Sequence, residues 1–152
     1  TLQTVRRDVQ RLSEAGLLSQ EVINAITLIP ANLSIEQMRS IYGIADWYVS
    51  PYRGEGFNLP VCEALACGTP VVVTRGGSTD DFVPVHGQHF IEATLSRNVQ
   101  LQGRNISGYL EPSLEHLTQI LSALQPKPPG QTHAFPTWSW NKVAESLLNV
   151  LD

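Results

Sequence analysis

The sequence predicts an α/β fold in which helices lie on both faces of a parallel sheet. Short runs that are apolar throughout indicate strands buried on both faces, because a half-exposed strand would alternate. Stretches with helical spacing of apolar residues separate these runs, so the predicted order is β-α-β-α-β. Consecutive parallel strands require such crossover helices. The expected strands are residues 26–29, 46–50 and 70–74.

The N-terminal third contains two predicted helices and one predicted strand. Apolar residues recur at helical spacing over residues 4–18. The β-branched run 26–29 ends at a proline, which favours a buried strand. Ser34 and Gln37, three residues apart, form a capping box, so we expect a helix that starts there and ends near the next glycine.

The middle of the chain has the clearest pattern. A strand over residues 46–50 leads into a glycine-containing loop over 51–57. Asn58 is expected to cap the following helix, which has a proline in its first turn, and Gly68 ends it. Residues 70–74 then form an apolar strand.

The second half is less regular. Residues 83–109 show no periodicity of apolar residues, so we predict neither helix nor strand there. Ser113 can cap a helix that extends to about residue 124. Prolines after residue 125 exclude a helix and predict a stiff linker. The expected organisation is one domain over residues 1–125, a Pro-rich linker over 126–137 and a C-terminal helix over 138–152.

Composition and charge argue against several classes of protein, among them nucleic-acid-binding and membrane-spanning proteins. The net charge of −4 argues against a protein that binds nucleic acid through phosphates. No apolar run is long enough to span a bilayer, so no transmembrane segment is expected. Cys62 and Cys67 fall on different faces of a predicted helix, which argues against a disulfide between them. No histidine at ligand spacing lies nearby, which argues against a zinc site. We interpret them as small buried hydrophobic residues.

The loop over residues 51–57 and the helix after it carry the candidate chemistry. Ligands of open parallel sheets bind beyond the carboxyl ends of strands, where this loop is expected. The first turn of a helix offers unpaired N–H groups and a favourable dipole to an anion such as phosphate. Gly54 and Gly56 would let a ligand approach the backbone closely.

Two carboxylates bracket this turn. Glu55 lies in the loop and Glu63 in the helix, with seven residues between them. Carboxylates accept bidentate hydrogen bonds from vicinal hydroxyls, which a sugar presents. Glu55 could instead simply complement the helix dipole. The apolar neighbours of Glu63 predict a buried helix, so its carboxylate needs a partner, and a protein donor such as Arg75 or Thr74 is the alternative to a ligand.

This region resembles the signature of the GT-B glycosyltransferases of family four, also called glycosyltransferases group one. The resemblance is close over residues 26–82 and includes two glutamates separated by seven residues. It implies a partial Rossmann-like sheet, the C-terminal half of a GT-B fold. It also implies retaining transfer of a hexose from a nucleotide diphosphate sugar to an acceptor hydroxyl. The matching positions include Ala45-Asp46, Ser50-Pro51, Glu55-Gly56-Phe57, Leu59-Pro60, Glu63 to Cys67 and Gly68 to Val72.

The resemblance also assigns roles to single positions. Glu63 matches the glutamate that holds the ribose hydroxyls, and Glu55 matches the catalytic glutamate at the transferred sugar. Asn32, with the two residues before it, matches the loop against the base. The turn whose backbone amides contact the sugar and the pyrophosphate corresponds to Gly56, Phe57, Asn58 and Leu59.

Several positions depart from the family pattern. Asn58 replaces a glycine, and its side chain can cap the helix and touch the sugar. Arg53 can lie near a phosphate or be solvated in its loop. The resemblance implies no cofactor and no DxD-type metal site. The pair Asp80–Asp81 is expected to cap a helix rather than bind a metal, although Asp80 could also contact ribose.

We expect the chain by itself to be inactive. In the family, an arginine and a lysine that neutralise the pyrophosphate, and an N-terminal domain that binds the acceptor, precede this region. The expected partners are therefore the nucleotide-sugar donor and that missing domain. The cytoplasm is the expected location, because nucleotide sugars are made there, with loose membrane association through the missing domain as an alternative.

Two other functions stay open. One is a non-catalytic module that binds nucleotide sugars or another protein. The other is a different enzyme of related architecture, such as a nucleotide-sugar epimerase or a glycogen-phosphorylase-like enzyme, although Lys127 and Lys142 lie far from the motif. His86 and His89 fit exposed loop residues better than a general base.

Overall fold

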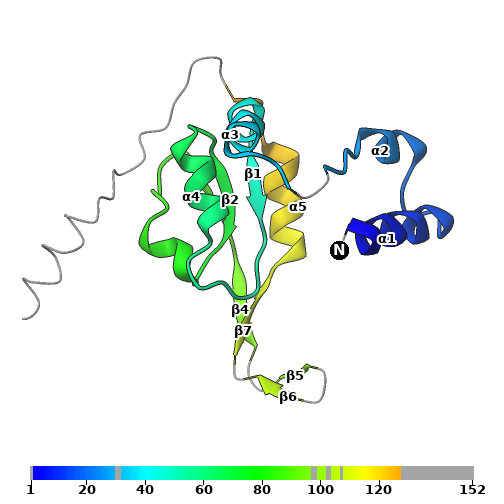
Figure 1. Ribbon diagram of the computed structural model, residues 1–152. Helices are drawn as coiled ribbons and strands as arrows, with labels where there is room; N and C mark the ends of the chain where they lie inside the picture. Colours follow the sequence, from blue (N-terminus) through cyan, green and yellow to red (C-terminus); the bar gives the residue numbers. More distant parts are fainter. Residues whose placement is uncertain (1, 30–31, 97–98, 102–103, 107, 128–152) are drawn as a thin grey trace, which may run out of the picture. The chain divides into compact units, whose positions relative to one another are not determined.

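The structure is a computed structural model that describes all residues except 1, 30–31, 97–98, 102–103, 107 and 128–152 (Figure 1). The chain divides into two compact units, Thr1–Gln37 and Met38–Asp152. The boundary falls in the first turn of α3 (Ile35–Ile44).

The first unit is helical. Helix α1 (Leu2–Glu14) confirms the predicted amphipathic helix, and α2 (Gln20–Ala25) follows it, capped by the hydroxyl of Ser19. The strand predicted at residues 26–29 is wrong: Ile26 ends α2, and this segment has no strand partner among the described residues. Ile26 and Ile29 are 39% and 45% exposed. A β-branched run forms a strand only where a neighbouring strand is available.

The second unit is built on a parallel sheet, as predicted. Strands β1 (Tyr48–Ser50), β2 (Val71–Thr74) and β3 (His89–Ile91) lie in this order, and both pairs are parallel. Strand β3 falls in the stretch that the sequence left unassigned. Its first residue, His89, is exposed, like the loop residue His86.

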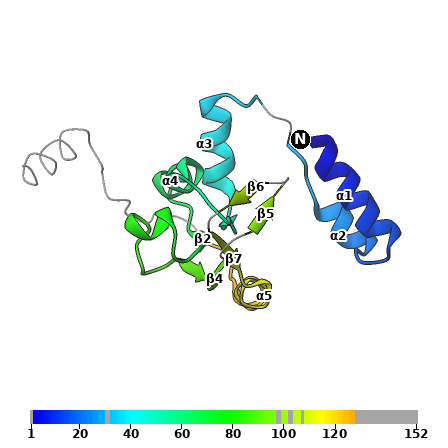
Figure 2. The same ribbon diagram turned by 90° about the horizontal axis from the view of Figure 1, so that it is seen from below.

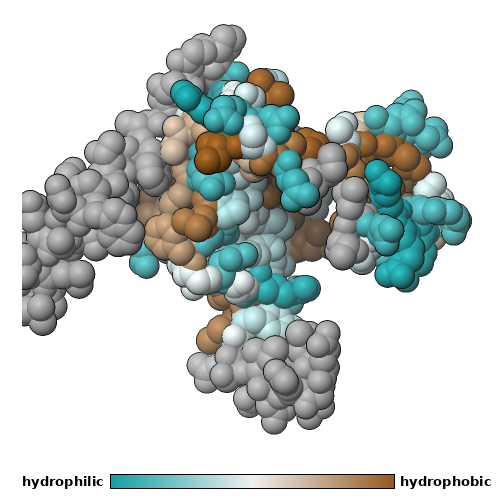
Figure 3. Space-filling model, in the orientation of Figure 1, coloured by the Kyte–Doolittle hydropathy of each residue, from teal (hydrophilic) through white to brown (hydrophobic). Residues whose placement is uncertain are grey.

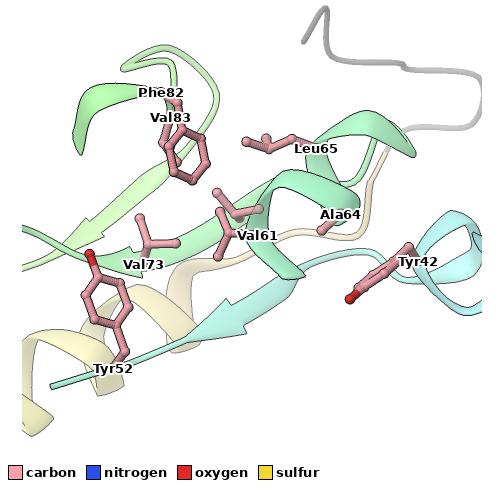
Figure 4. Close-up of a cluster of buried hydrophobic side chains, with 9 residues drawn as sticks. Tyr42, Tyr52, Val61, Ala64, Leu65, Val73, Phe82 and Val83 are labelled. Atoms are coloured by element: carbon pink, nitrogen blue, oxygen red, sulfur yellow. The ribbon is translucent and has the colours of Figure 1, made fainter. Parts of the chain in front are cut away.

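Helices cover both faces of this sheet (Figures 1 and 2). Helix α4 (Leu59–Ala66) packs Val61 and Leu65 against Val71 and Val73 of β2 (Figure 4). On the other face Val72 joins Ile91 of β3 and Ile120 of α5 (Leu114–Ala123). Successive residues of β2 alternate between the two faces, so all four of its residues are buried. This explains why the strand reads as one continuous apolar run.

Helix starts and ends follow the predicted signals in three places. The Ser34 hydroxyl accepts from the Gln37 N–H at 3.3 Å and the Gln37 side chain accepts from the Ser34 N–H at 2.8 Å, which confirms the capping box of α3. Ser113 caps α5 through the His116 N–H. Gly68 follows α4 with φ 76°, a left-handed conformation that suits glycine.

A hairpin follows β3 and leads back to α5. Strands β4 (Ala93–Ser96) and β7 (Tyr109–Pro112) pair antiparallel, as do β5 (Val99–Leu101) and β6 (Arg104–Ile106) beyond them. Figure 1 shows β4 and β7 running from the lower end of the sheet, below the loop that joins β1 to α4.

The end of the chain is described only in part. Of the predicted Pro-rich linker, Lys127 is held by the Asp46 carboxylate and the Gly43 carbonyl at 3.0 and 3.2 Å. The predicted helix over 138–152 lies outside the described residues. Within the described part of the chain, no helix combines the length and hydrophobicity needed to cross a membrane.

Candidate functional site

The loop between β1 and α4 carries most of the predicted site residues at the carboxyl end of β1. Glu55, Gly56 and Phe57 lie in the loop, Leu59 is the first residue of α4, and Glu63 is inside that helix. All five are exposed. The surface over α3 and α4 carries both hydrophobic and hydrophilic residues (Figure 3). The strand–loop–helix arrangement predicted from the sequence is therefore confirmed.

Tyr52 anchors the start of this loop. Its ring is buried, and its hydroxyl donates to the Thr74 carbonyl at 3.0 Å and lies 2.7 Å from the Thr79 hydroxyl. Gly77 leaves room for it, because a Cβ there would come within 2.8 Å of Tyr52 Cε2. The loop after β1 is thus tied to the end of β2 and to the short 3-10 helix η1 (Ser78–Asp81).

Phe57 anchors the other end of the loop. Its ring stacks on Phe82 with centroids 4.8 Å apart and an interplanar angle of 29°. Phe82 is buried, whereas half of the Phe57 surface is exposed. One face of Phe57 is therefore fixed by packing while the other stays open.

Asn58 stands directly before α4, but its side chain does not cap the helix. It is 6% exposed, it makes no capping hydrogen bond, and its Nδ2 donates to the Ser50 hydroxyl at 3.2 Å. The predicted cap is wrong because the residue adopts φ 64° and ψ 61°, whereas a capping side chain needs an extended backbone. This left-handed conformation favours glycine and tolerates asparagine.

Backbone amides remain available around the start of α4. Across the described residues, we find no hydrogen-bond acceptor for the N–H groups of Gly56, Phe57 and Leu59. A Cβ built on Gly54 or Gly56 would meet nothing within 4 Å. The backbone here is thus open to an anion, as a helix N-terminus requires.

Glu63 has a protein partner that the sequence did not reveal. Its Oε2 accepts from the hydroxyl of Tyr42 on α3 at 3.1 Å. The apolar face of α4 is buried, as predicted, and a protein donor holds the carboxylate, which was one of the two alternatives. The two suggested donors are wrong. Glu63 is exposed, Arg75 lies over the Phe90 ring at 4.4 Å, and the buried Thr74 hydroxyl has no partner among the described residues.

Tyr42 and Tyr48 lie near the carboxylates, and both have raised pKa values. Burial, and then the hydrogen bond with Glu63, raises the pKa of Tyr42 above its ordinary value. Burial raises the pKa of Tyr48 as well; a hydrogen bond with Ser50 opposes that rise, and the negative charges of Glu63 and then Glu55 add to it. Both carboxylates therefore act on one phenol at the start of β1.

The sequence pattern gave no signal for these tyrosines. Tyr42 and Tyr48 pack edge to face with centroids 5.6 Å apart, and Ser50 connects β1 to Asn58. A sequence pattern usually assigns an aromatic residue on an amphipathic helix to the hydrophobic core. Only the tertiary contact between α3 and α4 shows that Tyr42 orients Glu63.

An open cavity of about 640 Å³ lies beyond the carboxyl ends of β2 and β3. Its lining includes Arg75, Glu92, Thr94 and Glu111, but neither Glu55 nor Glu63. Its size falls in the range of about 300–1,000 Å³ that small-molecule sites occupy. The site predicted at α4 and this cavity are thus separate features of the same edge of the sheet.

Other predicted residues have structural partners. The helix cap expected at Asp80–Asp81 is wrong, because Gly77 is the N-cap of η1 and no side chain caps it. Asp80 instead accepts from the Gly76 N–H at 2.9 Å, which stabilises the turn before η1. Arg53 is exposed to solvent in its loop, as one of the two alternatives expected, and it pairs with Glu111. In the described ranges, no three His, Cys, Asp or Glu side chains gather as a group that could hold a metal ion.

The two cysteines lie on and directly after α4, whereas Asn32 lies in the first unit. Cys62 and Cys67 are free and partly buried against the core, so the expected lack of a disulfide is confirmed and full burial is wrong. Burial, helped by the charge of Glu63, raises the pKa of the Cys62 thiol. Asn32 is exposed with φ 78° and belongs to the first unit, so its role at the base stays a prediction.

Several curated proteins are similar to most of this chain. An MMP alpha-(1->4)-mannosyltransferase of Mycolicibacterium hassiacum is 26% identical over 144 residues, which cover 90% of this chain and 31% of the relative. A GDP-mannose-dependent monoacylated alpha-(1-6)-phosphatidylinositol monomannoside mannosyltransferase of Corynebacterium glutamicum is 27% identical, covering 78% and 30%. A D-inositol 3-phosphate glycosyltransferase of Mycolicibacterium smegmatis is 29% identical, covering 84% and 26%.

The chain spans less than a third of the length of these relatives. No solved structure matches it significantly. The family described as glycosyl transferases group 1 matches residues 7–99, which include the sheet, α4 and both glutamates of the motif. The chain therefore belongs to the glycosyl transferases group 1 family.

Proposed function

We propose that this chain is the donor-binding part of a retaining hexosyltransferase. The observation that carries the proposal is the turn before α4, where unpaired backbone amides lie between Glu55 and Glu63 in sequence. A nucleotide diphosphate sugar offers this turn both a diphosphate and two sets of hydroxyls. The turn thus offers matching groups to the diphosphate and to the hydroxyls of both sugars.

Glu63 would hold the ribose hydroxyls of the nucleotide. Its carboxylate is exposed and keeps one oxygen free of the Tyr42 hydrogen bond. The tyrosine hydroxyl donates to one oxygen and so fixes the orientation of the other, which is how a supporting contact prepares a ligand site. Carboxylate hydrogen bonds are charge-assisted and therefore stronger than neutral ones.

Glu55 would lie at the transferred hexose, and the amides of Gly56, Phe57 and Leu59 at the diphosphate. In the reaction the bond between the anomeric carbon and the diphosphate oxygen breaks. A bond from that carbon to the acceptor oxygen forms on the same face, and the proton of the acceptor hydroxyl passes to the departing diphosphate. Preorganised amides stabilise the negative charge that develops on the departing diphosphate.

The relatives suggest which donor to test first. Two of them are mannosyltransferases by name, and one name specifies GDP-mannose. We infer a hexose donor and choose GDP-mannose as the first ligand. We also propose that a further domain supplies the acceptor site, that binding requires no metal, and that this chain alone does not catalyse transfer.

The test is a titration of the ¹⁵N-labelled chain with GDP, UDP and ADP and their common hexose derivatives, followed by amide chemical shifts. The proposal predicts shifts centred on residues 56–63 with one nucleotide. Glu63→Ala should weaken that binding about 10- to 100-fold, since a hydrogen bond to a charged group contributes about 1.5–3 kcal/mol. Glu115→Ala removes an exposed helical glutamate on α5 and serves as the matched control.

Shifts that centre elsewhere, or equal weakening by Glu63→Ala and Glu115→Ala, would contradict this donor site. If the full-length protein binds the nucleotide but transfers no hexose, the alternative of a non-catalytic binding module gains support.

A further inference from the structure

The segment that carries Glu55 has few contacts of its own. Gly54, Glu55 and Gly56 are exposed, and a Cβ on either glycine would meet nothing within 4 Å. Glycine also leaves the backbone more conformational freedom than any other residue. The position of the Glu55 carboxylate therefore depends on the residues that anchor the two sides of this segment.

On the C-terminal side the anchors are local. Phe57 stacks on Phe82, and Asn58 is buried against Ser50. On the N-terminal side Tyr52 is buried, but Arg53, which directly precedes Gly54, is exposed. The contacts of Arg53 therefore determine the position and direction of the backbone where the segment Gly54–Gly56 begins.

Arg53 is held by β7, a strand 58 residues further along the chain. Its Nε and one terminal nitrogen donate to the two carboxylate oxygens of Glu111 at 2.9 and 2.8 Å. Its carbonyl accepts from the Leu110 N–H at 2.8 Å, and its guanidinium lies 5.8 Å from the centre of the Tyr109 ring. The backbone hydrogen bond alone would still let the chain rotate about it. The two side-chain hydrogen bonds to Glu111 restrict that rotation, because they hold Arg53 at a second point.

Strand β7 is itself fixed to the sheet. Glu111 pairs with Thr94 and Leu110 with Leu95 in the β4–β7 ladder. At the base of the hairpin the Ser113 N–H donates to the Glu92 carbonyl at 2.7 Å, directly after β3. The Arg53–Glu111 pair therefore connects the loop to an element that the parallel sheet supports.

We propose that Glu111 is a positioning residue that holds the loop of Glu55 in the geometry required at the transferred sugar, acting through Arg53. This inference rests on the proposed function, because it assumes that Glu55 lies at the hexose. The hairpin β4–β7 is then part of the donor site although none of its residues need contact the donor.

The chemistry of the pair makes this role testable. A guanidinium fork matches a carboxylate at two points, and neither a lysine nor a glutamine reproduces that match. The side chains of Arg53 and Glu111 are 65% and 41% exposed, and exposed ion pairs contribute little to folding stability. Loss of the pair should therefore loosen the loop without unfolding the protein.

The experiment compares the wild-type chain with Glu111→Gln and with the charge reversal Arg53→Glu/Glu111→Arg. Glu115→Gln, which removes a charge four residues away, is the control. The first readout is the ¹⁵N order parameter of the Gly54, Glu55 and Gly56 amides. The second is the affinity for GDP and for GDP-mannose, measured separately by calorimetry.

We expect the three order parameters to fall from about 0.85 toward about 0.6 in Glu111→Gln, and to recover at least partly in the charge reversal. The affinity for GDP-mannose should fall severalfold while the affinity for GDP stays unchanged. Unchanged order parameters in a folded Glu111→Gln variant would overturn the inference. The inference would also be overturned if the order parameters fall in Glu111→Gln but the ratio of the affinities for GDP-mannose and GDP stays as in the wild-type chain.

The two proposals fail in different ways. If the wild-type chain binds no nucleotide, the donor site is wrong, and the role of Glu111 at the sugar falls with it even if the loop loosens. If the wild-type chain binds GDP-mannose at α4 but Glu111→Gln behaves as Glu115→Gln does, the donor site stands and only the positioning role is wrong.

Discussion

Gly56 allows a test of ligand contact that does not disturb the fold. A Cβ at this position would meet no protein atom within 4 Å, so Gly56→Ala should leave the free energy of unfolding nearly unchanged. If a diphosphate lies against this backbone, the methyl group displaces it. We predict a loss of donor affinity of about tenfold or more, since one charge-assisted contact contributes about 1.5–3 kcal/mol.

Calorimetric titration of the variant checks this prediction. Gly43→Ala, a second glycine with open space around its Cα, is the matched control and should bind as wild type does. Equal affinity of Gly56→Ala and wild type would mean that no ligand approaches this turn.

Asn58 combines a left-handed backbone with a buried side-chain hydrogen bond. Asn58→Ala places a Cβ with no compensating hydrogen bond in this conformation. We predict that the free energy of unfolding falls by about 1–3 kcal/mol, from the cost of the left-handed backbone and of the lost bond. Asn58→Gly loses the same bond but relieves the backbone, so it should be the more stable variant.

Urea denaturation of the two variants decides between them. If Asn58→Ala is as stable as Asn58→Gly, the left-handed conformation does not explain why asparagine stands at this position.

Among the elements, those set by local patterns could be predicted. Strand β2 is buried on both faces, and its continuous apolar run identified it. Helix α4 begins after Asn58 and ends before Gly68, as the proline and glycine signals indicated. The capping box of α3 was equally local. In each case neighbouring residues contain the information that determines the structure.

Elements that depend on distant partners could not be predicted. The run at residues 26–29 has strand propensity, but α2 takes its first residue as a C-cap and no described strand pairs with it. Strand β3 is only three residues long and acquires its structure from β2.

The same limit applied to the candidate site. Glu55 and Glu63 were found because they lie on one local motif. The contacts of Tyr42 with Glu63 and of Glu111 with Arg53 were missed because 21 and 58 residues separate the partners.

The contact between the loop after β1 and the turn after β2 is also testable. Gly77→Ala would drive Tyr52 out of its place, because a Cβ there comes within 2.8 Å of the tyrosine ring and closest to the hydroxyl oxygen. We predict a loss of about 1–3 kcal/mol in the free energy of unfolding, as expected for overpacking.

Tyr52→Phe removes the atom that clashes most, so the double variant should be more stable than the sum of the two single effects implies. Chemical denaturation of all four proteins measures this coupling. Strict additivity would show that Gly77 is not required by Tyr52.

At the scale of the whole molecule, the raised pKa values of Tyr42 and Tyr48 predict sensitivity to alkali. Their ordinary pKa is 10.0, and in the folded state it lies higher. Below pH 10 both tyrosines are protonated in the folded and in the unfolded state, so their contribution to the free energy of unfolding is fully present. Above it the unfolded state loses these protons first, so the free energy of unfolding falls as pH rises.

Urea midpoints measured between pH 8 and about pH 12 should therefore decrease at the alkaline end. Tyr42→Phe cannot ionise and should show a shallower decrease. A decrease as steep in Tyr42→Phe as in wild type would show that Tyr42 does not contribute to it.

The measurement that tests the central claim most directly compares Glu63→Gln and Glu55→Gln for their affinities toward GDP and GDP-mannose. If Glu63 holds the ribose, Glu63→Gln weakens both ligands by the same factor, about 10- to 100-fold. If Glu55 lies at the hexose, Glu55→Gln weakens GDP-mannose and leaves GDP unchanged. Binding of both ligands that neither substitution alters would contradict a donor site between these two glutamates.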